Sequence, residues 1–314
     1  MIKGIFDALC LYDVDTVRME IIAFTFTIGS FVGQLITDDV GVKSFCSLIS
    51  TDFIIRKGKN MGNQTLSEEI RSYWTDRAGG YSRVNQEELQ SVQKDRWKQV
   101  ILEQLPGQRK EEVRILDIGT GPGFFAILLA EEGYQVTAVD CTEEMLCEAK
   151  KNAGKYAGRI QWYRMDAQNL LFEDESFDYI VTRNVTWNLE YPKEAYAEWH
   201  RVLKPKGRIL NFDANWYAYL YDEKKKRGYE RDRQNAKVNQ VEDYYEGTDI
   251  IRMEQIARQV PLSPVMRPEW DLRIMKKIGF LSCWADRHIG ERVLSEAEKI
   301  NYSSTPVFMI CGEK

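Results

Sequence analysis

The stretch LDIGTGPG at residues 116–123 decides the fold, because it joins an apolar run to a segment with the composition of a helix. The run at 113–118 is apolar enough for a strand that is buried on both faces of a sheet. Gly119, Gly121 and Gly123 lack Cβ atoms, so a ligand can approach the backbone closely. The helix that follows presents unpaired N–H groups and the positive end of its dipole. The stretch therefore predicts a ligand-binding turn between a strand and a helix.

From this turn to the end of the chain, strand patterns alternate with helix patterns. Strands are expected at 113–118, 135–140, 159–165, 177–183, 208–212, 281–287 and 306–311, and helices at 124–132, 143–153, 192–203 and 269–278. Two helices are expected before them, one capped by Thr65 with Glu68 three residues later, and one over 85–105. This alternation predicts an α/β fold with a doubly wound parallel sheet and right-handed crossovers.

Two segments depart from the alternation. Residues 1–60 show no clear amphipathic period, and we expect an N-terminal extension before a domain at 61–314. The codons for 56–60 can be almost purely purine, as in a ribosome-binding site, which favours an internal start at Met61 over an extension that packs on the core or on a partner. Residues 216–260 form a polar, tyrosine-rich, helix-prone block, which is expected to be either a lid over the ligand crevice or a solvated insertion.

The composition excludes several classes of protein. The 314 residues are 44% hydrophobic and 29% charged, which argues against a wholly disordered chain and against a multi-span membrane protein. The net charge of -5 lacks the basic field that nucleic-acid binding usually needs. The uncharged run at 21–37 is short for a span and contains polar residues, so we expect no membrane span. Six scattered cysteines and two distant histidines predict reduced thiols, a cytoplasmic location and no metal site.

Acidic residues at the strand ends indicate the ligand. Asp140 ends the second strand, where an acid can accept from both hydroxyls of a ribose. Asp166 follows the third strand, where its carboxylate could accept from an adenine amino group, and Asp117 lies close to the glycine turn. An acid at that point serves an ammonium or sulfonium centre better than a pyrophosphate, which favours S-adenosylmethionine. Because residues 121–126 also fit the pattern Gly-x-Gly-x-x-Ala, an NAD(P)-linked oxidoreductase is the alternative enzyme.

The chain resembles the class I S-adenosylmethionine-dependent methyltransferases, in the broad type 11 group that contains the quinone-biosynthesis C-methyltransferases. Similar motifs lie at 117–123, 139–140, 166–167, 177–184 and 202–208, the last with Lys206 where glycine is usual. The resemblance covers roughly 61–314 and implies a seven-stranded, mostly parallel, Rossmann-like sheet with helices on both faces and an antiparallel last strand. It also implies S-adenosylmethionine as cofactor and methyl transfer as the reaction. A non-catalytic S-adenosylmethionine-binding protein is the alternative outside enzymes.

The motifs give two sets of site residues. The expected cofactor-binding residues are Asp117, Gly119, Thr120, Gly121, Gly123, Asp140, Cys141, Met145, Asp166, Ala167, Asn184 and Tyr81, with Trp74 and Tyr81 closing over the donor. Candidates on the acceptor side are Asn184, Trp187, Asn188, Asp213, Asn215 and Trp216, which follow the fourth and fifth strands, and His288.

The expected acceptor is a small molecule. The segment after the fourth strand reads Asn-Val-Thr-Trp at 184–187, which is not the Asp/Asn-Pro-Pro-Tyr/Phe motif of amino-group nucleobase methylation. Methyl transfer from a sulfonium depends mainly on placement of the nucleophile and on exclusion of water. The sequence leaves open whether O, N, S or C receives the methyl group.

Overall fold

The first strand, β1 (Arg114–Ile118), lies near the middle of a seven-stranded sheet with the order β3-β2-β1-β4-β5-β7-β6. The other strands are β2 (Gln135–Asp140), β3 (Ile160–Arg164), β4 (Phe177–Arg183), β5 (Leu203–Asp213), β6 (Ser282–Asp286) and β7 (Phe308–Glu313). Neighbours among β1 to β5 are parallel, whereas β7 runs antiparallel to both β5 and β6. The predicted doubly wound sheet with an antiparallel last strand is confirmed in this computed structural model, which describes residues 65–105 and 109–314.

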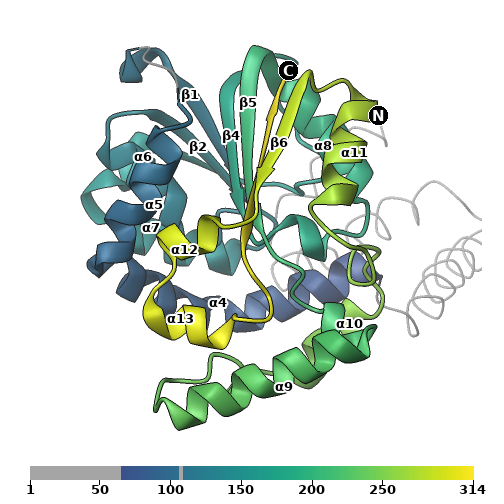
Figure 1. Cartoon of the computed structure of the whole chain (residues 1–314). Helices are drawn as coiled ribbons and strands as arrows, with labels where there is room; N and C mark the ends of the chain where they lie inside the picture. The colour runs from purple at the N-terminus through teal and green to yellow at the C-terminus, as the bar shows by residue number, and fades with distance from the viewer. Residues whose placement is uncertain (1–64, 106–108) are drawn as a thin grey trace, which may run out of the picture. The chain divides into compact units, whose positions relative to one another are not determined.

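Helices cover both faces of this sheet (Figure 1). One face packs against α5 (Val92–Leu102), α6 (Phe124–Glu131) and α12 (Ile289–Val293). The other packs against α8 (Pro192–Val202) and α11 (Glu269–Ile278). Successive residues of a strand point to opposite faces of the sheet, so Ile115 packs in the first helix layer and Leu116 in the second. Both side chains are fully buried, so the apolar run that predicted a strand is explained by burial on both faces.

The helix at the start of the described chain is longer than the sequence predicted. It is α4 (Leu66–Gln90), and Thr65 and Glu68 form the expected capping box. The second helix was predicted to begin at residue 85, which is wrong: α4 continues to Gln90, and Ser91 caps the next helix by accepting from the backbone of Gln93. Buried contacts of Glu88 with the sheet hold the end of α4 in place, and no local signal encodes them.

The fifth strand also begins earlier than predicted. The strand was predicted at 208–212, but β5 starts at Leu203 and pairs with β4 across a register shift between Phe177 and Tyr179. Lys206 accommodates this register shift by adopting a φ of 65°, in the left-handed region that favours glycine. Its backbone N–H donates to the carbonyl of Lys314 at 2.8 Å, which fixes this conformation.

The tyrosine-rich block 216–260 folds into η5 (Ala218–Leu220), α9 (Glu223–Val238) and α10 (Ile250–Ala257). In Figure 1 both of its α-helices lie beyond α4, on the side where the parallel strands end. Met253 and Ile256 of α10 are buried with Ile70 and Tyr73 of α4 in one apolar cluster. The block is therefore packed onto α4 as a structured part of the molecule.

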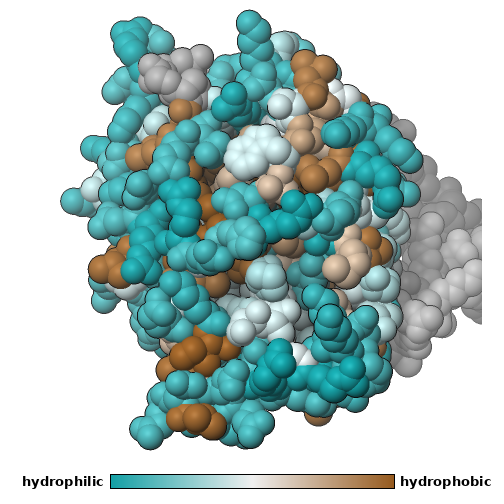
Figure 2. Space-filling view, viewed as in Figure 1, coloured by the Kyte–Doolittle hydropathy of each residue, from teal (hydrophilic) through white to brown (hydrophobic). Residues whose placement is uncertain are grey.

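The remaining elements connect these layers. They are α7 (Glu143–Ala153) and α13 (Glu296–Asn301), with the short helices η2 (Lys110–Glu112), η3 (Gly154–Arg159) and η4 (Thr186–Asn188). The face seen in Figure 2 is mainly hydrophilic, with hydrophobic side chains in small separate groups. The expectations for 1–60, the internal start at Met61 and the uncharged run at 21–37 lie outside the described residues. None of the helices that the structure describes combines the length and the apolar character needed to cross a membrane.

Candidate active site

Two cavities open where the parallel strands end. The first cavity encloses about 850 Å³, part of it open to solvent, and is lined by the glycine turn after β1, the end of β2, the segments after β3 and β4, and α4. The second cavity encloses about 690 Å³ and is lined by α4, η4 and the block 216–260. Trp74, Tyr81 and Asn184 line both cavities, so the two meet at these three residues.

The glycine turn forms part of the wall of the first cavity. Gly119 and Gly121 have φ values of 63° and 53°, in the left-handed region. A Cβ at Gly119 would lie 2.3 Å from Cγ2 of Val185, which no side chain can accommodate. A Cβ at Gly121 would lie 3.6 Å from Cε1 of Tyr81, inside the space that a ligand would use. The turn thus leaves backbone exposed to the cavity, as the sequence predicted.

Asp140 joins the end of β2 to the glycine turn. Its Oδ2 accepts from the backbone N–H of Gly121 at 3.0 Å, and its Oδ1 accepts from the N–H and the hydroxyl of Thr142, both at 2.9 Å. Burial raises the pKa of this carboxyl group, and these hydrogen bonds oppose the rise. The carboxylate lines the first cavity and can still accept from a ligand, because each oxygen has two lone pairs.

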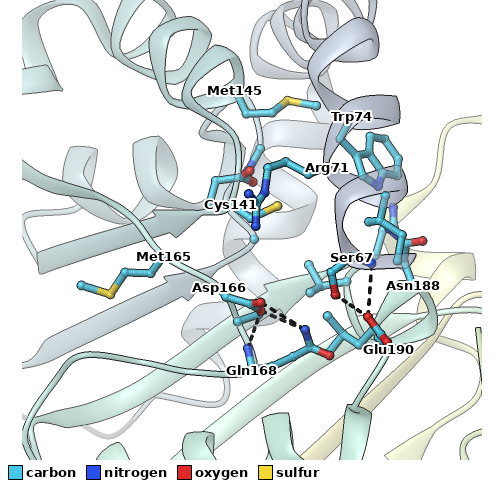
Figure 3. A pocket seen from close by; sticks show the side chains of 18 of the residues that line it. Ser67, Arg71, Trp74, Cys141, Met145, Met165, Asp166, Gln168, Asn188 and Glu190 are labelled. Carbon is cyan, nitrogen blue, oxygen red and sulfur yellow. Dashed lines mark hydrogen bonds between the residues drawn. The ribbon is translucent and has the colours of Figure 1, made fainter. Parts of the chain in front are cut away.

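Asp166 lies after β3, with apolar neighbours around it. Its Oδ1 accepts from the backbone N–H of Gln168 at 2.9 Å and from the side-chain amide at 3.0 Å, as drawn in Figure 3. Cys141, Met145 and Met165 complete this end of the cavity, and α4 lies across from them (Figure 3). Burial raises the pKa of Cys141 to about 12, so at neutral pH its thiol is uncharged and acts as a packing group.

Asp117 faces a different direction from the one that the sequence suggested. Its Oδ2 accepts from the hydroxyl of Thr120 at 2.6 Å and from the N–H of Ala126 at 3.0 Å, and the residue is 2% exposed. Burial raises its pKa to about 7. Asp117 and Thr120 line a smaller cavity of about 290 Å³ beneath the turn, whereas Gly123 packs against Ala149. These residues support the conformation of the glycine turn.

Sequence reasoning missed Arg183, which lines both the first cavity and the smaller one. Its guanidinium donates to the two carboxylate oxygens of Glu88 at 2.8 Å each, and it lies 4.6 Å from the ring centroid of Phe124. The side chain is only 13% exposed, and its bidentate pairing holds the guanidinium firmly in one orientation. A charged residue that ends β4, directly after the buried residues 179–182, was the signal that could have identified it.

A second missed contact fixes α4 over the first cavity. The backbone N–H and the hydroxyl of Ser67 both donate to Oε2 of Glu190, at 3.2 and 2.5 Å (Figure 3). Arg71 and Trp74, further along α4, also line the cavity. Because Ser67 and Glu190 are far apart in sequence, only the fold brings them together.

The acceptor-side candidates separate into three groups. Trp187 and Trp216 line the second cavity together with Asn184, whereas Asn188 lines the first. Asp213 is fully buried in an ion pair with Arg267, and it accepts from the backbone of Trp187 at 3.0 Å and from the indole of Trp216 at 3.1 Å. Asp213 therefore positions two cavity residues and does not face the cavity itself.

The remaining two candidates lie apart from the cavities that we describe. Asn215 exchanges two hydrogen bonds with the backbone of Arg267, at 2.9 and 3.1 Å. His288 has an 80% exposed side chain and contacts Glu291 at 2.9 Å. The described residues contain no group of three or more His, Cys, Asp or Glu side chains that could hold a metal ion.

Comparison with known proteins places this site in a family. Residues 116–211, which include the glycine turn, Asp140, Asp166 and Asn184, match the family model described as a methyltransferase domain. The chain carries a class I S-adenosylmethionine-dependent methyltransferase domain.

The methyltransferase domain is similar to curated relatives along part of their length. It is 37% identical to the ubiquinone/menaquinone biosynthesis C-methyltransferase UbiE of Paracoccus denitrificans over 117 residues, 36% of this chain and 46% of that protein. It is 34% identical to UbiE of Desulfotalea psychrophila over 168 residues, 52% of this chain and 61% of that protein. The chain thus spans roughly half the length of these relatives, so their substrates are not carried over to it.

A solved structure shows the same fold. It is a chain described as a methyltransferase in a complex with the Haloferax volcanii Trm112 methyltransferase activator. The TM-score is 0.52 at 17% identity, and the match covers 76% of this chain and 96% of that one. At this identity the likeness supports the architecture of the methyltransferase domain and nothing about its acceptor.

Proposed function

We propose that the chain transfers a methyl group from S-adenosylmethionine, bound in the first cavity, to a small molecule bound in the second. The observation that carries this proposal is that the two cavities meet at Trp74, Tyr81 and Asn184. A methyl group held at this junction would be accessible from both sides. Transfer between two bound molecules requires this arrangement, because the reacting atoms must come within about 3–3.5 Å of each other.

The residues of the first cavity suit an adenosine group. Asp140 offers carboxylate oxygens to two ribose hydroxyls, and Asp166 offers one to an exocyclic amine. The side chains of Cys141, Met145 and Met165 provide an apolar pocket for a flat base. Gly121 also lines this cavity, and a Cβ there would meet only Tyr81, at 3.6 Å, so its missing side chain leaves room for the amino-acid end of the cofactor.

Bound S-adenosylmethionine supplies an electrophilic methyl group, and the chain supplies placement. Trp74 and Tyr81 pack edge to face with ring centroids 5.8 Å apart, where they would exclude water from the junction. Their aromatic faces favour a cationic centre nearby. Asn184 holds a φ of 60°, and its N–H donates to the carbonyl of Phe212 at 2.8 Å, which fixes its position at the junction.

We propose a cytoplasmic small-molecule enzyme rather than one that acts on nucleic acid. The net charge of -5 opposes binding to a polyanion, and the second cavity has the size of a small-molecule site.

Isothermal titration with S-adenosylhomocysteine and with NAD tests the proposed function. S-adenosylhomocysteine should bind in the micromolar range or tighter, and NAD should bind far more weakly. Tight NAD binding without S-adenosylhomocysteine binding would support the oxidoreductase instead. Acceptor-dependent release of S-adenosylhomocysteine then separates an enzyme from a protein that only binds the cofactor.

A further inference from the structure

The second cavity is walled mainly by aromatic side chains from distant segments of the chain. Tyr73 comes from α4, Trp187 from η4, Trp216 and Tyr217 from the segment after β5, and Tyr302 from the region after α13. The rings of Trp187 and Tyr217 are 5.0 Å apart at 31°, and those of Trp216 and Tyr302 are 5.1 Å apart at 78°. Ring faces and edges at these angles suit a flat aromatic ligand, which can stack on one wall and meet the edge of another.

The charge of this cavity is unbalanced. Of its described lining residues, Arg77 carries the one formal charge, and the lining includes no Asp, Glu, Lys or His. Arg77 is half-buried, and within 65–105 and 109–314 it makes no ion pair. A Cβ at Gly80 would lie 3.2 Å from Nη1 of Arg77, so the missing side chain of Gly80 leaves space for the guanidinium. A partly buried cation with no ion-pair partner among the described residues favours an anionic ligand.

The tyrosines add hydrogen-bond donors to this positive site. Burial raises the pKa values of Tyr217 and Tyr302 well above the ordinary range. Their hydroxyl groups therefore remain protonated and can donate to an anion. Neither hydroxyl can serve as a base at neutral pH, and the described lining holds no carboxylate or imidazole for that purpose.

We propose that the second cavity binds a planar aromatic acceptor that reacts as its anion, a phenolate, with Arg77 compensating its charge. This inference rests on the proposed function. The oxygen lone pair of the phenolate forms the new C–O bond as the C–S bond breaks and its electron pair stays on sulfur. A sulfonium cation and a phenolate anion give a neutral ether and a neutral thioether. No proton has to be removed, so the step needs no base from the lining.

An ammonium acceptor is the competing possibility, because aromatic faces also attract cations. An ammonium ion, however, must lose a proton before its nitrogen has a lone pair with which to attack, and the described lining offers no carboxylate or imidazole to accept that proton. The charge of Arg77 also opposes a cation in the same space. These two observations favour the phenolate.

The test measures binding of three ring compounds of similar size to the full chain. They are 2,6-dichlorophenol, which is ionised at mildly alkaline pH, its neutral methyl ether, and benzylammonium. Calorimetric titrations are run with and without saturating S-adenosylhomocysteine. We expect the phenolate to bind at least about tenfold more tightly than the other two. Equal affinities, or a preference for benzylammonium, would overturn the inference.

Variants of Arg77 assign the preference to this residue. Arg77→Gln should remove the tenfold preference and leave S-adenosylhomocysteine affinity unchanged, whereas Arg77→Lys should retain most of it. Arg83→Gln is the matched control, because Arg83 is an exposed arginine on the same helix and does not line the cavity. If Arg77→Gln fails to fold, titration of the three ring compounds into the unmodified chain and into Arg77→Lys still shows whether the cavity prefers the phenolate. A preference that survives in a folded Arg77→Gln variant would refute the assignment.

The outcome separates this inference from the proposed function. If S-adenosylhomocysteine binds but the phenolate has no advantage, the acceptor class is wrong and the methyltransferase proposal stands. If S-adenosylhomocysteine does not bind, the proposed function is wrong, and the titrations without it still show whether the second cavity selects aromatic anions.

Discussion

Replacement of Asp140 by asparagine tests the cofactor site most directly. The carboxylate accepts from the backbone of Gly121 and from two donors of Thr142, and it lines the cavity into which the ribose would project. Asparagine keeps the volume of the side chain and one acceptor oxygen, but its NH₂ group cannot accept a hydrogen bond. Either the N–H of Gly121 or a ribose hydroxyl then loses its acceptor.

The size of the effect follows from the kind of bond that is lost. A hydrogen bond to a charged group is worth about 1.5–3 kcal/mol. Since about 1.4 kcal/mol corresponds to a tenfold change in dissociation constant, Asp140→Asn should weaken S-adenosylhomocysteine binding roughly 10- to 150-fold. Asp140→Ala removes both oxygens and should cost at least as much. Isothermal titration measures both changes, and a thermal melt shows that each variant is folded.

The pH dependence of binding supplies a second readout. Burial raises the pKa of Asp140, and only the ionised carboxylate accepts from both ribose hydroxyls. In the unmodified chain, affinity should therefore fall as the pH drops through this raised pKa. The corresponding profile of Asp140→Asn should be flatter, because its side chain does not titrate.

Asp178 provides the matched control. Its carboxylate accepts from the backbone of Arg114 and from Lys204, both at 2.9 Å, near the start of β4 and away from the cavities described. Asp178→Asn should leave S-adenosylhomocysteine affinity unchanged. If folded Asp140→Asn binds S-adenosylhomocysteine as tightly as the unmodified chain does, the assignment of the ribose site is refuted.

Four further changes have defined outcomes. Gly121→Val should abolish S-adenosylhomocysteine binding in titrations, because a β-branched side chain at φ 53° is strained and would lie against Tyr81. Gly79→Ala should raise the free energy of unfolding in urea by about 0.5–1 kcal/mol, since position 79 lies inside α4 and a Cβ there meets nothing within 4 Å. The protonated form of Asp117 stabilises the fold below the ordinary pKa of 3.8, and this contribution is lost as the pH rises through about 7. As the pH rises through that range, the free energy of unfolding measured in urea should therefore fall by up to about 4 kcal/mol more in the unmodified chain than in Asp117→Asn. Tyr245→Ala, in the wall of the second cavity, should lower turnover with any acceptor and leave S-adenosylhomocysteine affinity intact, and an equal loss of both would indicate a structural role for the block 216–260.

The sheet and the lining of the first cavity were predictable because their signals are local. Gly119, Asp140 and Asp166 each come at or just after the end of a strand. In a parallel sheet such positions meet at one edge, so three short motifs predict one cavity. The orientation of Asp117 was not predictable, because the same motif allows its carboxylate to face the ligand or the helix behind the turn. Contacts to Thr120 and Ala126 decide between the two.

The parts that sequence reasoning missed depend on pairs of residues that are distant in the chain. Glu88 meets Arg183, and Ser67 meets Glu190, only after α4 has packed across the ends of the strands. The boundary between α4 and α5 has the same origin, since buried contacts extend α4 beyond its predicted end. A periodicity argument contains no information on such contacts, because it describes one element at a time.

The two cavities depend on different parts of the chain, so substitutions should affect them differently. The first cavity uses motifs that also hold the sheet together, so a substitution such as one at Gly119 damages the turn as well as the ligand site. Part of the wall of the second cavity comes from the block 216–260, which packs on α4 rather than on the sheet. Substitutions in this wall can alter the shape and charge of the cavity and leave Asp140 and the glycine turn in place. Acceptor preference should therefore be separable from cofactor affinity, and Arg77 is the residue at which to begin, because it carries the charge of that cavity.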